Sequence, residues 1–252
     1  MNLEVAIIFA FESCILNSIK NLVITQNHKM TDITGNDQIA EVYFNRGSAK
    51  IDLLDYAGAI AEYTKAIEMN PQFAEAYHNR GLAKKNIFDN NGAIADYSTA
   101  INIDPDFAEA YFNRGTAKAA IQDHIGAIKD FTKAIEINPC YGAAYTNRGI
   151  VRGKLQKYNG ALDDATKAIE INPKNSTAYY NRGRTNCHLH YYIEAIADFT
   201  NAIRLNIKFA PAYFNRGVVK LILDQRDSAL VDLYKAKYYG EDQADAVIKK
   251  YC

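Results

Sequence analysis

Residues 108–141 read AEAYFNRGTAKAAIQDHIGAIKDFTKAIEINPCY, and the fold of the chain can be derived from this 34-residue unit. Its tripeptide Asn-Arg-Gly, which begins at Asn113, occurs six times in the chain, each time 34 residues after the last. A fixed period of this length, without insertion or deletion, is typical of stacked structural repeats. Counted as positions 1 to 34, the six repeats start at Ala40, Ala74, Ala108, Gly142, Ser176 and Ala210.

Each repeat has the pattern of two helices. In the third repeat we predict a first helix over about residues 109–121, a turn at residues 122–124 and a second helix over about residues 126–138. Pro139, which follows, ends the second helix. Position 8 is Gly and positions 20 and 27 are Ala in all six repeats, as expected where helix axes approach closely. A large aromatic side chain stands at position 24 in four repeats, and Ala165 replaces it in the fourth.

A single helix hairpin cannot bury its apolar face, whereas six stacked hairpins can. With Tyr at position 4, Gly at 8, Ala at 20 and 27 and often Pro at 32, the chain resembles the tetratricopeptide repeat family. The resemblance implies an all-α fold, a right-handed superhelical solenoid of antiparallel helix pairs, and a role in protein recognition. Three positions depart from the family pattern, because Tyr replaces Trp at position 4, Arg replaces Leu at position 7 and Lys mostly replaces Tyr at position 11.

Three segments are expected along the chain. Residues 1–39 precede the repeats and combine a helical apolar stripe, from Ile8 to Leu22, with a polar linker. The stripe could dock on the first repeat, extend without packing or associate with a membrane. The repeats cover residues 40–239, as 40–73, 74–107, 108–141, 142–175, 176–209 and 210–239. Residues 240–252 are expected to form a C-terminal capping helix after a glycine at residue 240.

Position 7 is Arg in every repeat, at a site where the family usually places Leu, so this cation should be partly buried and need a partner. Position 23 is acidic in every repeat and lies level with position 7 in an antiparallel hairpin. We therefore expect a structural ladder of ion pairs, each formed within one repeat or with the neighbouring repeat. A ligand-binding role for the arginines is the alternative. The arginines are Arg46, Arg80, Arg114, Arg148, Arg182 and Arg216, and the acids are Glu62, Asp96, Asp130, Asp164, Asp198 and Asp232.

The resemblance places positions 2, 5, 6, 9, 12 and 13 on a concave, ligand-binding face. Position 6 is always Asn, whose amide can both donate to and accept from a peptide backbone; bonding between neighbouring helices is the alternative. The expected peptide-binding residues are Asn45, Asn79, Asn113, Asn147, Asn181 and Asn215 at position 6, and Phe44, His78, Phe112, Tyr180 and Phe214 at position 5. The first half of this groove carries Glu41, Glu75 and Glu109, and the second half carries Lys154, Arg184 and His188.

The amino-acid composition argues against several classes of function. The 29 basic and 29 acidic side chains give no net charge, which argues against a nucleic-acid ligand. No apolar run is long enough to span a bilayer, which argues against membrane association. The four cysteines are scattered without a CxxC pair, so we expect no zinc pattern, no disulfide framework and a cytoplasmic location. The Cys187–His190 segment is too small a cluster for zinc, so no metal and no cofactor are expected.

No catalytic motif is present, so the chain is expected not to be an enzyme. The sequence favours a scaffold that binds an extended peptide or a partner helix in its concave groove. Two alternatives remain open: a structural solenoid that self-associates through its ends, giving a homo-oligomer, and an accessory module that delivers substrate to a separate enzyme.

Overall fold

The computed structural model describes residues 35–251, and these residues form thirteen α-helices without a strand. The apolar stripe expected before the repeats lies outside the described residues. In chain order the helices are α2 (Gly35–Asp52), α3 (Tyr56–Met69), α4 (Ala74–Asn86), α5 (Asn90–Ile103), α6 (Ala108–Ala120), α7 (His124–Ile137), α8 (Gly142–Lys154), α9 (Tyr158–Ile171), α10 (Ser176–His188), α11 (Tyr192–Leu205), α12 (Ala210–Ile222), α13 (Arg226–Tyr238) and α14 (Gln243–Tyr251). The first of them begins at Gly35, five residues before the first repeat.

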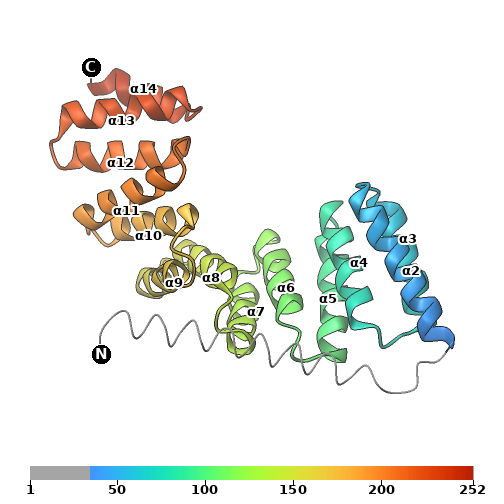
Figure 1. The fold of residues 1–252 in the computed structure, drawn as a ribbon. Helices are drawn as coiled ribbons and strands as arrows, with labels where there is room; N and C mark the ends of the chain where they lie inside the picture. Colours follow the sequence, from blue (N-terminus) through green and yellow to red (C-terminus); the bar gives the residue numbers. More distant parts are fainter. Residues whose placement is uncertain (1–34, 252) are drawn as a thin grey trace. The chain divides into compact units, whose positions relative to one another are not determined.

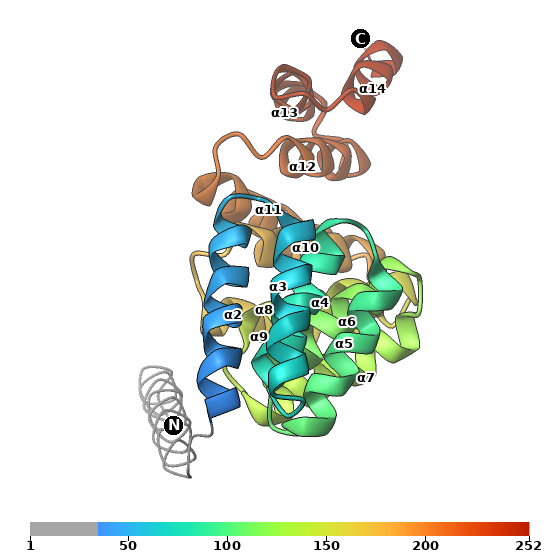
Figure 2. The same ribbon diagram turned by 90° about the vertical axis from the view of Figure 1, so that its right-hand side faces the viewer.

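The chain divides into two compact halves, one ending at Tyr141 and one beginning at Gly142. In the N-terminal half α2–α3, α4–α5 and α6–α7 form three antiparallel hairpins (Figure 1). The pair α2–α3 lies side by side in both views (Figures 1 and 2). The C-terminal half contains the hairpins α8–α9, α10–α11 and α12–α13, followed by α14. Within each half the second helix of a hairpin packs on the first helix of the next, so each half is an α-helical solenoid.

The turn inside each hairpin is made by the backbone rather than by glycine. Position 15 has a left-handed φ between 57° and 65° in all six repeats, although none of these residues is Gly. In the third repeat this residue is Gln122, and Asp123 after it caps α7 by accepting a hydrogen bond from the Gly126 backbone N–H at 2.9 Å. Because of this cap, α7 begins at His124, two residues earlier than expected.

The core repeats one contact between the two helices of a hairpin. In four repeats the aromatic ring at position 24 is almost completely buried and lies directly on the glycine at position 8. A β-carbon added to Gly115, for example, would lie only 2.9 Å from Cε1 of Phe131. This ring contact explains the glycine physically, because any side chain at position 8 would overlap the ring.

The last helix covers the end of the C-terminal half. Gly240, with a φ of 96°, follows α13 and lets the chain reverse. Helix α14 then buries Ala244 and Ile248 in one cluster with Leu233 and Ala236 of α13. The otherwise exposed apolar face of the last hairpin is thereby shielded.

Cys140 is disulfide-bonded, although the scattered cysteines were expected to form no disulfide framework. The bond removes the argument from cysteine spacing for a reducing compartment. Among residues 35–251, no helix combines the length and the apolar character that crossing a bilayer requires.

Candidate functional site

Each position-7 arginine faces the position-23 acid of its own repeat. In the third repeat, Arg114 donates through Nη2 to Asp130 Oδ1 at 2.7 Å and through Nε to Asp130 Oδ2 at 2.9 Å. This is the bidentate geometry of a strong guanidinium–carboxylate pair. The acids are buried in every repeat, and the corresponding pairs are Arg46–Glu62, Arg80–Asp96, Arg148–Asp164, Arg182–Asp198 and Arg216–Asp232.

The arginine also contacts an aromatic ring of its own repeat and a side chain of the preceding repeat. The Arg114 guanidinium lies 5.4 Å from the ring centre of Tyr111, in cation–π geometry. Its Nη1 donates at 3.1 Å to Ser98 Oγ of the preceding repeat. The same guanidinium therefore ties both helices of its own hairpin to the hairpin before it.

Position 11 supplies a second cation that was not anticipated. Lys118 lies 2.8 Å from Asp130 Oδ2, on the carboxylate oxygen that also accepts from the arginine Nε. Lys84, Arg152 and Lys220 make the equivalent contact in other repeats. The sequence does indicate this contact, because position 11 is basic in five of six repeats, at a site where the family has Tyr.

The position-6 asparagines have different surroundings from one repeat to the next. In two repeats the amide bonds the position-5 side chain of the preceding repeat: Asn113 Nδ2 lies 2.9 Å from His78 Nε2, and Asn215 Nδ2 donates to the Tyr180 hydroxyl at 3.1 Å. These two asparagines therefore link hairpins. The Nδ2 of Asn181 is buried without a hydrogen-bond partner.

Position-5 rings are sandwiched between two other rings of the same repeat. The ring centre of Phe112 lies 5.8 Å from that of Phe131 at position 24 and 4.9 Å from that of Tyr141 at position 34. Burial, followed by the charge of Glu109, raises the pKa of the Tyr141 hydroxyl to about 12. The other such trios are Tyr63–Phe44–Phe73, Tyr97–His78–Phe107 and Phe199–Tyr180–Phe209. Packing thus occupies much of the ring surface expected to face a ligand.

His78 is the one histidine among the members of these trios. Burial lowers the pKa of its imidazole below the usual 6.5, although its hydrogen bond to Asn79 and the charge of Glu109 oppose the shift. Its Nδ1 lies 3.1 Å from Asn79 Oδ1, and its Nε2 lies 2.9 Å from Asn113 Nδ2. In the neutral ring Nδ1–H can donate to the first amide while Nε2 accepts from the second.

His78→Phe is expected to flatten the dependence of stability on pH. Below pH 6.5 the unfolded state takes up a proton that the native state resists, so the wild type loses up to about 1.4 kcal/mol per pH unit as the pH falls. Thermal melts at pH 7.5 and 5.5 measure this loss. Phe44→Leu provides the control, because it changes the position-5 side chain of the first repeat without removing a titratable group and should retain the wild-type dependence. An unchanged dependence in His78→Phe would contradict the assignment.

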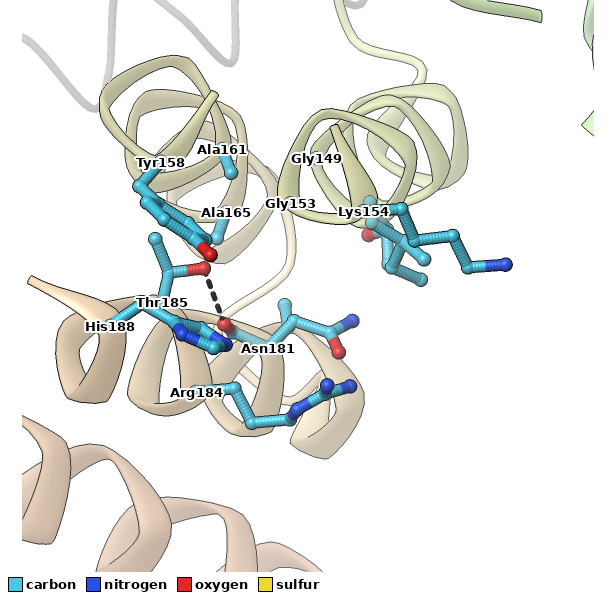
Figure 3. A pocket seen from close by; sticks show the side chains of 13 residues that line it. Gly149, Gly153, Lys154, Tyr158, Ala161, Ala165, Asn181, Arg184, Thr185 and His188 are labelled. Atoms are coloured by element: carbon cyan, nitrogen blue, oxygen red, sulfur yellow. Dashed lines mark hydrogen bonds between the residues drawn. The ribbon is translucent and has the colours of Figure 1, made fainter. Parts of the chain in front are cut away.

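The fourth repeat lacks all three rings of the trio. Thr146, Ala165 and Asn175 stand at positions 5, 24 and 34, and a pocket of about 140 Å³ opens between α8, α9 and α10 (Figure 3). Its buried wall is formed by small residues, among them Gly149 and Ala165. The remaining lining residues include Tyr158 and the polar side chains of Thr146, Lys154, Asn181, Arg184, Thr185 and His188.

The pocket brings together part of the residues expected on the ligand face. Lys154, Arg184 and His188, the basic half of the expected groove, all line it together with Asn181. The position-5 residues Tyr180 and Phe214 do not. Tyr158 was missed, and its ring stacks on His188 with centres 4.6 Å apart and planes 11° apart. The sequence feature that could have indicated this pocket is the absence of aromatic residues at positions 5, 24 and 34 of the fourth repeat.

The cysteine and histidine segment at the end of α10 has other contacts. Burial raises the pKa of the Cys187 thiol to about 11, which disfavours the thiolate that binds metals. Nδ1 of His190 lies 2.8 Å from the Tyr192 hydroxyl. In the part of the chain that the structure describes, His, Cys, Asp and Glu side chains form no group of three that could hold a metal ion.

Family models match most of the repeat region. One described as "TPR repeat" matches residues 47–86 and 89–122. Three described as "Tetratricopeptide repeat" match residues 142–175, 165–197 and 108–139. A comparison with curated proteins finds no match.

Solved structures with similar folds include MamA and YrrB. A crystal structure of MamA is 28% identical with a TM-score of 0.62, covering 68% of this chain and 93% of that one. YrrB, described as "a TPR protein with an unusual peptide-binding site", is 27% identical with a TM-score of 0.64, covering 75% of this chain and 97% of that one. PilF of Pseudomonas aeruginosa, at 18% identity, has a TM-score of 0.72, covers 84% of this chain and 100% of that one, and shows the fold alone.

Proposed function

Because the chain belongs to the tetratricopeptide repeat family, whose fold is that of a protein-interaction scaffold, we propose that it binds an extended peptide or a partner helix. In the C-terminal half the ligand lies along the first helices of the hairpins, α8, α10 and α12, where positions 5, 6, 9, 12 and 13 face it. The chain acts without catalysis of its own, and its partners are proteins or peptides rather than nucleic acids or membranes.

One observation carries this proposal: the pocket of the C-terminal half opens on the same positions that the family uses for ligands. Thr146, Ile150, Gly153 and Lys154 come from positions 5, 9, 12 and 13 of the fourth repeat. Positions 6, 9 and 13 of the fifth repeat complete this surface. YrrB, which has a similar fold, is described as having a peptide-binding site, and this supports a peptide as the ligand class.

The position-6 amides are suited to a backbone ligand. Asn147 and Asn181 are half-buried on neighbouring first helices, α8 and α10, and the Nδ2 of Asn181 lacks a partner. A buried N–H donor that lacks a partner costs free energy, which an acceptor on the ligand would restore. A peptide carbonyl is such an acceptor, and it is present at every residue of any partner.

The test uses the full chain as bait for partner capture, followed by calorimetry with the captured partner. The double variant Asn147→Ala with Asn181→Ala is expected to weaken binding by about tenfold or more, since two lost hydrogen bonds are worth about 2 kcal/mol. Its melting temperature should stay near that of the wild type.

Asn159→Ala, which truncates an exposed asparagine on the second helix α9 outside the positions that face the ligand, is the matched control and should bind as the wild type does. Unchanged affinity in the folded double variant would reject the groove as the binding surface. Light scattering in the same experiments tests the alternative of self-association, because a chain that only assembles with itself would capture its own copies and no other protein.

A further inference from the structure

The pocket of the fourth repeat occupies the space that aromatic rings fill in other repeats. In the third repeat the Phe131 ring covers Gly115, with Cε1 2.9 Å from the position of an added β-carbon. At the equivalent Gly149 the nearest atoms are the β-carbon of Asp164, at 3.2 Å, and two backbone atoms, at 3.4 and 3.8 Å, and none of the three belongs to a ring. The backbone around the glycine is thus shaped for a ring that the chain itself does not supply.

The volume of the pocket agrees with that of a missing aromatic ring. Its volume is about 140 Å³, and an apolar cavity of roughly 150 Å³ is known to admit a benzene ring. Its small buried residues, Ala161, Ala165 and Ala178, give an apolar surface. The stacked pair Tyr158 and His188 gives an aromatic wall.

The charges around the opening are of one sign. Lys154, Arg184 and His188 line the pocket, and no acidic residue does. The nearby Asp164 carboxylate is turned to Arg148 and Arg152, at 2.7 and 2.8 Å. In Figure 3 the side chains of Asn181 and Arg184 extend in one direction from α10, and Lys154 extends from α8 on the same side. Together they present donors and positive charge where a ligand would leave the pocket.

We propose that this pocket receives the ring of a Phe or Tyr residue of the peptide ligand, and that a carboxylate next to this residue pairs with Arg184 and Lys154. This inference rests on the proposed peptide-binding function and names the feature of the peptide that is recognised. The carboxylate is an acidic side chain beside the aromatic residue or the free carboxyl end of the peptide. Both sources present the same anion to the same cations.

Blocked five-residue peptides provide the probes, with binding followed by chemical-shift changes in the NMR spectrum of the full chain. The sequence Ser-Asp-Phe-Glu-Ser is expected to bind at least tenfold more tightly than Ser-Asp-Ala-Glu-Ser, which lacks the ring, or Ser-Asn-Phe-Gln-Ser, which lacks the charges. Ser-Gly-Phe with a free carboxyl end, compared with its amide, separates the terminal carboxylate from the acidic side chains. Equal binding of all these peptides would overturn the proposal.

Ala165→Phe is the decisive variant, because it places in the pocket the ring that Phe131 and Phe199 provide elsewhere. We expect the melting temperature to rise by about 2–6 °C, because the added ring fills the pocket and increases the free energy of unfolding. We also expect the affinity for Ser-Asp-Phe-Glu-Ser to fall at least tenfold. If Ala165→Phe does not fold, Ala165→Leu fills the same space with the residue type of Leu233 at this position. A folded, filled variant that binds as the wild type does would overturn the proposal.

The cations are tested separately by Lys154→Gln with Arg184→Gln. This pair is expected to reduce binding of the acidic peptide and its dependence on salt, while leaving Ser-Asn-Phe-Gln-Ser unaffected. Lys174→Gln, an exposed lysine outside the pocket in the same half, is the matched control. Equal losses for the acidic and the neutral peptide would remove the carboxylate from the proposal.

Two further outcomes separate this inference from the proposed function. If the captured partner still binds Ala165→Phe normally but loses affinity for Asn147→Ala with Asn181→Ala, the groove is correct and the aromatic pocket is wrong. If neither variant changes the affinity for the partner, both proposals fail. Phenylacetate that binds as tightly as Ser-Asp-Phe-Glu-Ser would assign the pocket to a small aromatic acid and overturn the peptide.

Discussion

Arg114→Ala is expected to lower the free energy of unfolding by about 2–4 kcal/mol. Removing one partner of a buried pair costs about 3–5 kcal/mol, because the other charge stays buried without compensation. Asp130 is only 5% exposed at its side chain, but Lys118 remains at 2.8 Å and offsets part of the loss. Urea unfolding followed by circular dichroism at 222 nm measures the change.

Arg46→Ala is the matched control for this prediction. It removes the same side chain from the same repeat position, but the Arg46 side chain is 60% exposed, against 17% for Arg114. A largely exposed pair contributes about 0–1 kcal/mol, so the expected loss is below 1 kcal/mol. Equal losses in the two variants would show that burial does not set the strength of the pair.

Gly115→Ala is expected to lower the free energy of unfolding by about 1–3 kcal/mol, although alanine is the better helix former. An added β-carbon would lie 2.9 and 3.0 Å from ring atoms of Phe131 and 3.2 Å from the Ala127 carbonyl oxygen. The Phe131 ring is completely buried, so it has no space into which to move. Overpacking of this kind exceeds the gain of up to about 1 kcal/mol in helix propensity.

Two glycines of α8, which is also the first helix of a hairpin, serve as controls for this prediction. Gly153→Ala should raise stability by about 0.5–1 kcal/mol, because a β-carbon there meets no atom within 4 Å. Gly149→Ala, at the same repeat position as Gly115, should cost less than Gly115→Ala because no ring covers it. Thermal and urea unfolding measure the stability of the three variants. Equal losses in all three would contradict the explanation that overlap with the Phe131 ring destabilises Gly115→Ala.

Much of the fold could be predicted because its cause is local and periodic. The 34-residue period gives six hairpins, and the invariant small residues show where the helices approach. Arg at position 7 and an acid at position 23 could be placed together from hairpin geometry alone. Each inference needs only the spacing of residues along a helix, which the sequence contains.

The remainder depends on contacts in three dimensions. Phe88 and Gln122 adopt a left-handed backbone without any glycine, so nothing in their residue types marks the turn. Phe112 was expected on the ligand face, but it packs between Phe131 and Tyr141, which lie 19 and 29 residues further along the chain. Ala165 was recognisable as an exception, but only the absence of rings at positions 5 and 34 as well turns one missing side chain into a pocket.

Because the repeats recur every 34 residues, the three ring positions of one repeat correspond directly to those of any other repeat. Because Phe112, Phe131 and Tyr141 occupy the positions of Thr146, Ala165 and Asn175, a binding cavity could be transplanted to the third repeat by copying three side chains, with no change to the backbone. The reverse exchange would close the cavity of the fourth repeat. Cavities of this kind can therefore be opened or closed in one repeat without altering the others.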